Sequence, residues 1–358
     1  MTRAALERSA WKIAHAGLEL DPAFRAFDEL LRPHVPYAIA SWSTHDPATA
    51  LFTSCTMTGV PKDPEGEARL FRCEFTADEP ASYRTLIGRQ EAAAILSEAT
   101  GGRLERASRY REIFAPVGFT DELRAVLWSG GTAWGSATLL RFDGRFTAQD
   151  VEAVTAIAHQ VADAVRLTLL RGAARRPGAL PEPPGVLEVD AAGGVTAMTA
   201  PAEHWLHAHG QRLITAVNAA AAAIRARPDW SGTTSRLALD DGRILSVHAA
   251  ALSVRDDTVA VIVEHARPAE VSAILVDAYG LTARQRDVLG QILLGRSMTR
   301  LAHALGISEY TAQDHRKAIY QRMGVASRSE LAALLQFEQY DPRVWAEIPP
   351  SPYGGFLE

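Results

Sequence analysis

Near the C-terminal end of the chain, apolar residues recur every three or four positions, which is the spacing of short amphipathic helices. Over residues 281–335 this spacing predicts four helices, of which the middle two form a helix-turn-helix. Thr282 can cap the first helix, with Gln285 three residues on as its capping-box partner. We expect Gly306 to turn the chain between the second and third helices, because glycine accepts positive φ, and Ser308 to cap the third.

The first half of the chain combines helical spacing with the alternation of strands, which predicts an α+β region over residues 1–172. Gly130 and Gly131 indicate a hairpin between its last two strands, and residues 61–67 read as a polar loop. The expected elements are helices at 2–20 and 21–31, strands at 37–42, 50–55 and 70–75, helices at 79–98 and 106–114, strands at 122–128 and 133–141, and a helix from Thr147 to Arg171.

A second α+β region is expected at residues 185–266, after a semi-stiff, proline-rich linker at 173–184. A connecting helix at 267–279 then leads to the helix-turn-helix domain at 280–338, and residues 339–358 form a tail. The elements expected in the second region are strands at 185–190 and 195–198, helices at 201–206 and 211–225, and strands at 237–239, 243–251 and 258–264.

The long helix that begins at Thr147 carries an apolar stripe with alternating spacings of three and four, which is coiled-coil spacing. Two interpretations remain open. The stripe either packs on the sheet of its own region or forms a dimer seam, and both can hold along different faces. The stripe consists of Val151, Val154, Ala158, Val161 and Val165.

Composition narrows the class of protein. With 358 residues, 47% hydrophobic and 22% charged, the chain is expected to be globular, with two or three domains. No run of eighteen apolar residues predicts a membrane span, and no signal-peptide core is evident. The two cysteines, Cys55 and Cys73, predict neither a disulfide framework nor a zinc site, so a reducing cytoplasm is the expected location.

Charge is distributed unevenly along the chain. The net charge is −5, yet the predicted helix-turn-helix has a basic excess of the kind that binds phosphates. Arginine is abundant throughout the chain, so only this local excess is informative. The basic residues are Arg284, Arg286, Arg296, Arg300, Arg316, Lys317, Arg322 and Arg328, against Asp287, Glu309, Asp314 and Glu330.

The C-terminal segment resembles the DNA-binding domain of LuxR-type transcription regulators. The motifs that carry the resemblance are Leu281-Thr282-x-Arg284, Gly295-x-Ser297, Ile307-Ser308-x-x-Thr311, His315, Met323-Gly324-Val325 and Arg328. The resemblance implies a recognition helix in the major groove of double-stranded DNA. It implies base-edge contacts from Gln313, Asp314 and Lys317, and phosphate contacts from Ser308 and Thr311. Arg316 joins the DNA-binding residues through the basic excess, and His315 is expected to support packing.

The segment departs from the family pattern at four positions. Gln285 replaces a Glu, Met298 an Asn, Ala312 a Val and Gln313 a Lys. The loss of that lysine removes a phosphate or guanine partner, and Asp314 adds a negative charge that suits only a cytosine N4 donor. We therefore expect modest intrinsic affinity and a need for dimerisation. The alternative is a degenerate domain that no longer binds DNA.

The two N-terminal regions resemble sensor domains. In the first, Trp134–Arg141 followed by Arg145-Phe146-Thr147-x-x-Asp150 is similar to the last strand and helix of GAF domains. In the second, the order of two strands, helices and three strands resembles a PAS-like fold. The expected fold class is therefore a multidomain α+β protein with a GAF-like α/β sensor, a PAS-like α/β domain and an all-α, four-helix LuxR-type domain. Core packing explains the tryptophans; the alternative is a ligand pocket formed by Trp42, Cys55, Trp128 and Trp134.

Several kinds of chemistry are missing from the sequence. No lysine lies between Lys62 and Lys317, which argues against a phosphorylated receiver domain, and there is no phosphate-binding Gly-x-x-x-x-Gly-Lys loop. The His45-Asp46 pair near Cys55 lacks the rest of a hydrolase site. The histidines at 204, 207 and 209 are more simply exposed residues than metal ligands. We expect no cofactor, no metal and no catalytic step.

These patterns predict a sequence-specific, DNA-binding transcription regulator. We expect a homodimer controlled by a small molecule of unknown identity or by a partner protein, with contact to RNA polymerase if it activates, and no membrane association. Two alternatives remain: a protein-interaction or dimerisation module whose helix-turn-helix no longer binds DNA, and an enzyme in the N-terminal half with turnover at Cys55.

Overall fold

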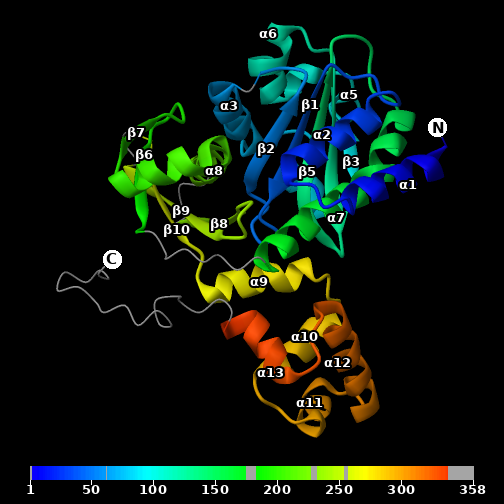
Figure 1. Cartoon of the computed structure of the whole chain (residues 1–358). Helices are drawn as coiled ribbons and strands as arrows, with labels where there is room; N and C mark the ends of the chain where they lie inside the picture. Colours follow the sequence, from blue (N-terminus) through cyan, green and yellow to red (C-terminus); the bar gives the residue numbers. More distant parts are fainter. Residues whose placement is uncertain (1, 62, 175–182, 227–231, 254–256, 338–358) are drawn as a thin grey trace.

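The computed structural model describes residues 2–61, 63–174, 183–226, 232–253 and 257–337. It contains a first α/β unit, a second α/β unit and a helical C-terminal part (Figure 1). The predicted linker lies mostly at 175–182 and the predicted tail entirely at 339–358, so both fall outside the described residues, apart from the ends of the linker.

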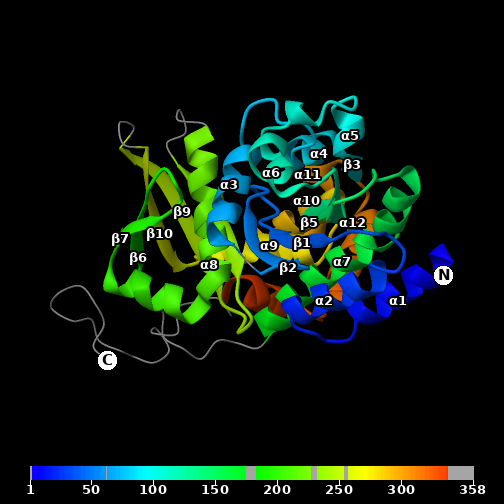
Figure 2. The same ribbon diagram turned by 90° about the horizontal axis from the view of Figure 1, so that it is seen from above.

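The first unit is built on an antiparallel sheet with the strand order β2-β1-β5-β4-β3. Helices α1, α2 and α7 cover one face of this sheet, and α3 lies on the other side (Figure 2). Its elements are α1 (Arg3–Ala14), α2 (Leu20–Leu31), β1 (Ile39–His45), β2 (Phe52–Thr58), α3 (Pro64–Glu74), α4 (Tyr83–Arg89), β3 (Ala93–Ile95), α5 (Leu96–Ala99), η1 (Leu104–Arg106), η2 (Tyr110–Phe114), α6 (Ala115–Val117), β4 (Asp121–Ser129), β5 (Thr132–Arg141) and α7 (Ala148–Ala174).

The apolar stripe of α7 is buried inside the chain. Val154 and Val161 are almost completely inaccessible, and they pack with Trp42 of β1 and Phe24 of α2 in one core. Thr147 caps the helix as predicted, because its hydroxyl accepts a hydrogen bond from the backbone N–H of Asp150 at 3.3 Å. The stripe therefore packs on its own unit, as the first of the two interpretations expected.

One strand prediction was wrong. Residues 70–75 belong to α3, which begins at Pro64, inside the segment predicted to be a polar loop. Asp63 caps this helix by accepting from the backbone N–H of Glu65 at 3.1 Å, and proline at the first helical position has the φ that a helix needs. Phe71 and Phe75, four residues apart, are both buried, which is helical rather than strand spacing.

The predicted helix over 79–98 is instead interrupted by a strand. Helix α4 ends at Arg89, and the next residue, Gln90, has a left-handed backbone with φ 56°. Residues Ala93 and Ile95 then pair with Ala125 and Leu123 of β4 as the edge strand β3. The alanine-rich segment has high helix propensity, but pairing with an existing sheet edge overrides that preference.

The second unit has the element order that the sequence predicted. Its antiparallel sheet runs β7-β6-β10-β9-β8, so the strand order matches that of the first sheet when strands are counted within each unit. Helix α8 covers one face, and Gly210 breaks it with φ 48° and ψ −131°, between the two helices expected there. The elements are β6 (Gly185–Val189), β7 (Val195–Met198), α8 (Ala200–Ala226), β8 (Thr233–Ala238), β9 (Ile244–Ser253) and β10 (Thr258–His265).

Buried polar contacts join the two units. The guanidinium of Arg236 lies 2.5 Å from the carboxylate of Asp46, and their side chains are 7% and 1% exposed. Farther along the interface, Glu67 of α3 accepts hydrogen bonds from Thr215 at 2.9 Å and from Gln211 at 3.0 Å, both on α8. Burying such charges is favourable only if they are paired, so these contacts fix how the units dock.

A connecting helix, α9, lies between the first unit and the C-terminal part (Figure 1). Ile274 joins the core of the first unit, and Arg166 of α7 donates to the carbonyl of Ala278 at 2.7 Å. On the other side, the hydroxyl of Ser272 donates to the carbonyl of Leu335. The remaining elements are α9 (Pro268–Ala278), α10 (Ala283–Leu293), α11 (Met298–Leu305), α12 (Glu309–Met323), α13 (Arg328–Ala332) and η3 (Ala333–Phe337).

Candidate DNA-binding surface

The first helix of the C-terminal part, α10, is capped as the sequence predicted. The hydroxyl of Thr282 accepts from the backbone N–H of Gln285 at 3.2 Å, and the Gln285 side chain accepts from the backbone N–H of Thr282 at 2.9 Å. The amide of Gln285 therefore does the work of the glutamate expected in the family pattern, because the capping box needs only an acceptor oxygen.

Helices α11 and α12 form the predicted helix-turn-helix. Gly306 ends α11 in a left-handed conformation with φ 63°, and the backbone N–H of Ile307 donates to the carbonyl of Ala302 at 3.0 Å. Ala302 and Ala312 are 3% and 0% exposed, so their small side chains allow close packing at the crossing. Ser308 caps α12 by accepting from the backbone N–H of Thr311 at 3.0 Å.

A small apolar core holds the four helices together. It explains two departures from the family pattern, because Ala312 is completely buried and Met298 packs at the edge of the core. Helix α13 contributes Leu331 to this core, and η3 contributes Leu335. The buried members are Leu281, Val288, Leu289, Ile292, Leu301, Ala302, Ala312, Ile319, Met323, Leu331 and Leu335.

The residues predicted to read DNA share one exposed face of α12. Gln313, Asp314 and Lys317 are all exposed, at the three- and four-residue spacings that place side chains on one side of a helix. None of the three takes part in a hydrogen bond or ion pair with any residue that the structure describes. Arg316 is half-buried beside this face.

At the start of α12 lie the two hydroxyl residues predicted to approach phosphates. The hydroxyls of Ser308 and Thr311 are 2.8 Å apart, so each is already engaged within the cap. The sequence reasoning missed Tyr310, whose side chain is 75% exposed and precedes Gln313 by three residues. Counting from the Ser308 cap would have placed Tyr310 on the exposed face.

Contacts within the chain already engage some of the basic residues of the domain. Arg284 donates to the carbonyl of Leu305 at 2.5 Å, and Arg286 pairs with Asp277 at 2.7 Å. Arg322 donates to the carbonyl of Gly280. Of the eight basic residues, these three therefore stabilise the domain and its junction with α9. The exposed cations left for an anionic partner include Arg296, Arg300, Lys317 and Arg328.

The structure does not bring together the four candidates for a ligand pocket. Trp42 and Trp134 lie in the core of the first unit, where the indole N–H of Trp42 donates to Asp28 at 3.4 Å. Trp128, a half-buried side chain, packs against a separate apolar cluster to which both units contribute. Only Cys55 lines a larger cavity, on the face of the sheet opposite Trp42.

The weaker chemical candidates have structural roles. Burial lowers the pKa of His45 to about 3, so its ring is neutral, and its Nε2 lies 2.9 Å from the hydroxyl of Ser136. The neighbouring carboxylate of Asp46 is engaged by Arg236. Within the described ranges, no three His, Cys, Asp or Glu side chains are grouped to hold a metal ion. None of the helices that the structure describes is long and apolar enough to cross a membrane.

Comparisons with known proteins agree with this geometry. Residues 280–335 match the family described as bacterial regulatory proteins of the luxR family. The transcriptional regulatory protein MctR of Rhizobium johnstonii is 43% identical over 51 residues, which are 14% of this chain and 24% of the relative. A putative HTH-type transcriptional regulator of Escherichia coli, YhjB, is 36% identical over 59 residues, which are 16% of this chain and 30% of the relative. The match thus spans less than a third of either relative.

Two solved structures are similar to the N-terminal part at low identity. A GAF domain from a phosphoenolpyruvate-protein phosphotransferase of Coxiella burnetii aligns at 14% identity with a TM-score of 0.36, over 48% of this chain and 96% of that one. The bacteriophytochrome RpBphP3 of R. palustris aligns at 10% identity with a TM-score of 0.33, over 72% of this chain and 61% of that one. Residues 280–335 are therefore a LuxR-family helix-turn-helix domain, carried by a multidomain α+β chain.

Proposed function

We propose that the protein is a sequence-specific, DNA-binding transcription regulator. The exposed face of α12 supports this proposal best, because Gln313, Asp314 and Lys317 lie together without partners among the described residues. Side chains of these types hydrogen-bond to base edges in the major groove, and each good pairing discriminates by about 1–3 kcal/mol. The two relatives, named as transcriptional regulators, support the same function.

In this proposal each residue of the surface has a distinct role. Gln313 and Asp314 read adenine and cytosine edges, and Lys317 contacts a guanine or a phosphate. Ser308, Thr311 and Arg316 approach the phosphate backbone, where the positive end of the α12 dipole adds to the attraction. A negative Asp314 beside a single lysine keeps the affinity of one domain low, so a homodimer on paired half-sites is the binding form.

Control of DNA binding is proposed to come from the two N-terminal units rather than from phosphorylation. In this proposal the first unit is a GAF-like sensor and the second unit is a PAS-like sensor, and neither carries out a catalytic step. A small molecule or a partner protein can shift DNA binding only if it has different affinities for the competent and incompetent arrangements. The proposed setting is the cytoplasm, with contact to RNA polymerase if the protein activates.

A second candidate is an interaction module whose helix-turn-helix has lost DNA binding. Tyr310, at 75% exposure, favours this alternative, because a large exposed aromatic beside the acidic Asp314 also suits a protein surface. The two candidates differ in their response to salt. DNA binding depends steeply on ionic strength through counterion release, whereas docking centred on Tyr310 depends on it weakly.

Selection of genomic DNA fragments by the full-length protein tests the proposal. We expect recovery of a short, two-fold repeated motif. Gln313→Lys should change the preferred base at one position in each half-site, because lysine pairs with guanine whereas glutamine pairs with adenine. Lys12→Ala, which removes an exposed lysine in α1, is the matched control and should leave the motif unchanged. Recovery of no motif, or of the same motif with Gln313→Lys, would contradict this assignment.

A further inference from the structure

A mostly apolar cavity in the first unit is left unexplained by DNA binding. It measures about 390 Å³ and lies between the sheet and helix α3, on the face opposite Trp42. This volume is within the range of small-molecule sites, roughly 300–1,000 Å³. Most of its wall is apolar, with large side chains from α3, from the η2–α6 segment and its flank, and from strands β1 and β5. They include Ile39, Leu70, Phe71, Phe114, Phe119 and Leu140.

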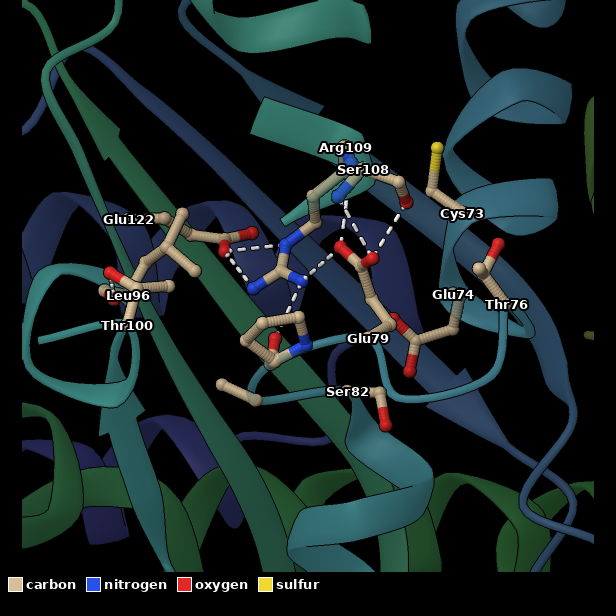
Figure 3. Close-up of polar contacts among 12 residues, drawn as sticks. Cys73, Glu74, Thr76, Glu79, Ser82, Leu96, Thr100, Ser108, Arg109 and Glu122 are labelled. Carbon is tan, nitrogen blue, oxygen red and sulfur yellow. Dashed lines mark hydrogen bonds and ion pairs between the residues drawn. The ribbon is translucent and has the colours of Figure 1, made fainter. Parts of the chain in front are cut away.

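One end of the cavity is polar and charged. The carboxylates of Glu74 and Glu122 line it together with the guanidinium of Arg124, and all three side chains are at most 5% exposed. Arg124 lies 2.5 Å from Glu74 and 2.9 Å from Glu122. Behind this layer, Arg109 lies between Glu79 and Glu122, at 2.7 Å and 2.6 Å (Figure 3).

The buried ionic cluster has more negative than positive groups. Three carboxylates, Glu74, Glu79 and Glu122, surround two guanidiniums, Arg109 and Arg124. Burial alone would raise the pKa of Glu122, but the two arginines outweigh it and hold that pKa below its usual value, so the carboxylate stays ionised. A buried negative charge in excess is costly, and a cation bound beside it would offset that cost.

Two further groups on the wall point to a ligand. Glu112 lines the cavity at its exposed side and pairs with no cation among the residues that the structure describes; its carboxylate accepts from the thiol of Cys73 at 3.8 Å. Ser43 is 3% exposed, and its hydroxyl joins none of the hydrogen bonds of the described chain, although it lines the same cavity. A ligand in the cavity can therefore hydrogen-bond to this hydroxyl, which both donates and accepts.

We propose that this cavity binds an organic cation, namely a protonated amine or amidine on an aromatic or aliphatic body. The apolar wall takes the body, the phenyl rings of Phe71 and Phe114 add cation–π attraction, and Glu112 with the buried acidic cluster attracts the charge. The inference rests on the ligand control in the proposed function and specifies the class of ligand.

Helix α3, which forms part of the cavity wall, also contacts the second unit. Leu70, Phe71 and Glu74 of α3 face the cavity, and Glu67 of α3 accepts hydrogen bonds from Thr215 and Gln211 of α8. A ligand that moves α3 would therefore act directly on the contact between the units.

Calorimetric titration of the full-length protein with three probes of one skeleton tests the inference. The probes are 4-phenylbutylamine, 4-phenylbutan-1-ol and 4-phenylbutanoate, which differ in charge at one end. We expect the amine to bind about tenfold more tightly than the alcohol, since hydrogen bonds to charged groups are the stronger ones, and the carboxylate to bind most weakly. Equal or tighter binding of the carboxylate would overturn the proposal in favour of Arg124 as an anion anchor, and no amine binding would overturn it altogether.

Three variants locate the site. Glu112→Gln should weaken amine binding about threefold to tenfold and leave the alcohol unchanged, because it removes one charge and keeps the shape. Glu105→Gln, the same change at an exposed position outside the cavity, is the control and should have no effect. Ser43→Leu should abolish binding of both probes by filling the cavity, provided that cooperative unfolding shows the variant to be folded.

Amine binding that survives both Glu112→Gln and a folded Ser43→Leu would overturn the assignment to this cavity. None of these titrations contains DNA. Absence of amine binding would therefore say nothing about the proposed DNA binding, which the selection of genomic fragments tests. Likewise, a protein that binds no DNA can still be titrated with the amine.

Discussion

Replacing Arg236 by methionine should strongly destabilise the contact between the two α/β units. The guanidinium of Arg236 lies 2.5 Å from Asp46, and the side chains are 7% and 1% exposed, so the variant leaves a carboxylate buried without its cation. Removal of one partner of a buried ion pair costs about 3–5 kcal/mol. The backbone N–H of residue 236, which donates to Asp46 at 2.8 Å, is kept in the variant. We therefore expect the loss of stability to lie near the lower end of this range.

Urea denaturation followed by tryptophan fluorescence measures this loss. Arg236→Met combined with Asp46→Asn should be less destabilised than Arg236→Met alone, because the double variant removes the unpaired charge. Arg25→Met is the control: it breaks an ion pair with Asp21 whose side chains are more than half exposed, and such pairs contribute at most about 1 kcal/mol. The reasoning is refuted if Arg236→Met costs no more than Arg25→Met, or if the double variant is the least stable.

Other predictions concern pH and helix caps. Burial holds the pKa of His45 near 3, whereas histidine in the unfolded chain has a pKa near 6.5. The folded state is therefore destabilised as pH falls below 6.5, by about 1.4 kcal/mol at pH 5.5. His45→Gln should remove this part of the pH dependence in denaturation curves. Ser308→Ala removes the cap of α12 and should cost about 1 kcal/mol in the same assay. Gln285→Ala should cost about as much, whereas Gln285→Glu, which keeps an acceptor oxygen, should be nearly neutral.

Local signals in the sequence predicted the C-terminal domain well. Thr282 and Ser308 cap helices by bonding to residues three positions ahead, and Gly306 turns the chain at its own position. These features therefore follow from spacing alone. Gly130 opened a hairpin for the same reason, and the helix break at Gly210 falls between the two helices expected at 201–206 and 211–225. The order of elements in the second unit was also readable, because each strand there is bounded by turn residues.

Features that depend on distant parts of the chain were not predicted. The segment at 93–95 has helical composition, and it becomes a strand only because β4 offers a sheet edge. Asp46 and Arg236 are 190 positions apart, and no pattern in either neighbourhood indicates the pair. The cavity was not predicted either. Alternation along β1 places Trp42 and Ser43 on opposite faces of the sheet, but it does not say that one face is the core and that the other lines a cavity.

The salt dependence of DNA binding tests the central claim most directly. The dissociation constant of the full-length protein for its selected DNA should rise linearly with salt on logarithmic axes. Lys317→Ala should weaken this binding, and a phosphate contact of Lys317 would show as a slope lower by about one for each recognition helix bound, whereas a guanine contact would leave the slope unchanged. Lys12→Ala, the control outside the domain, should leave the slope unchanged. An affinity for DNA that Lys317→Ala does not weaken, or no salt-sensitive binding at all, would contradict a DNA-reading role for the exposed face of α12.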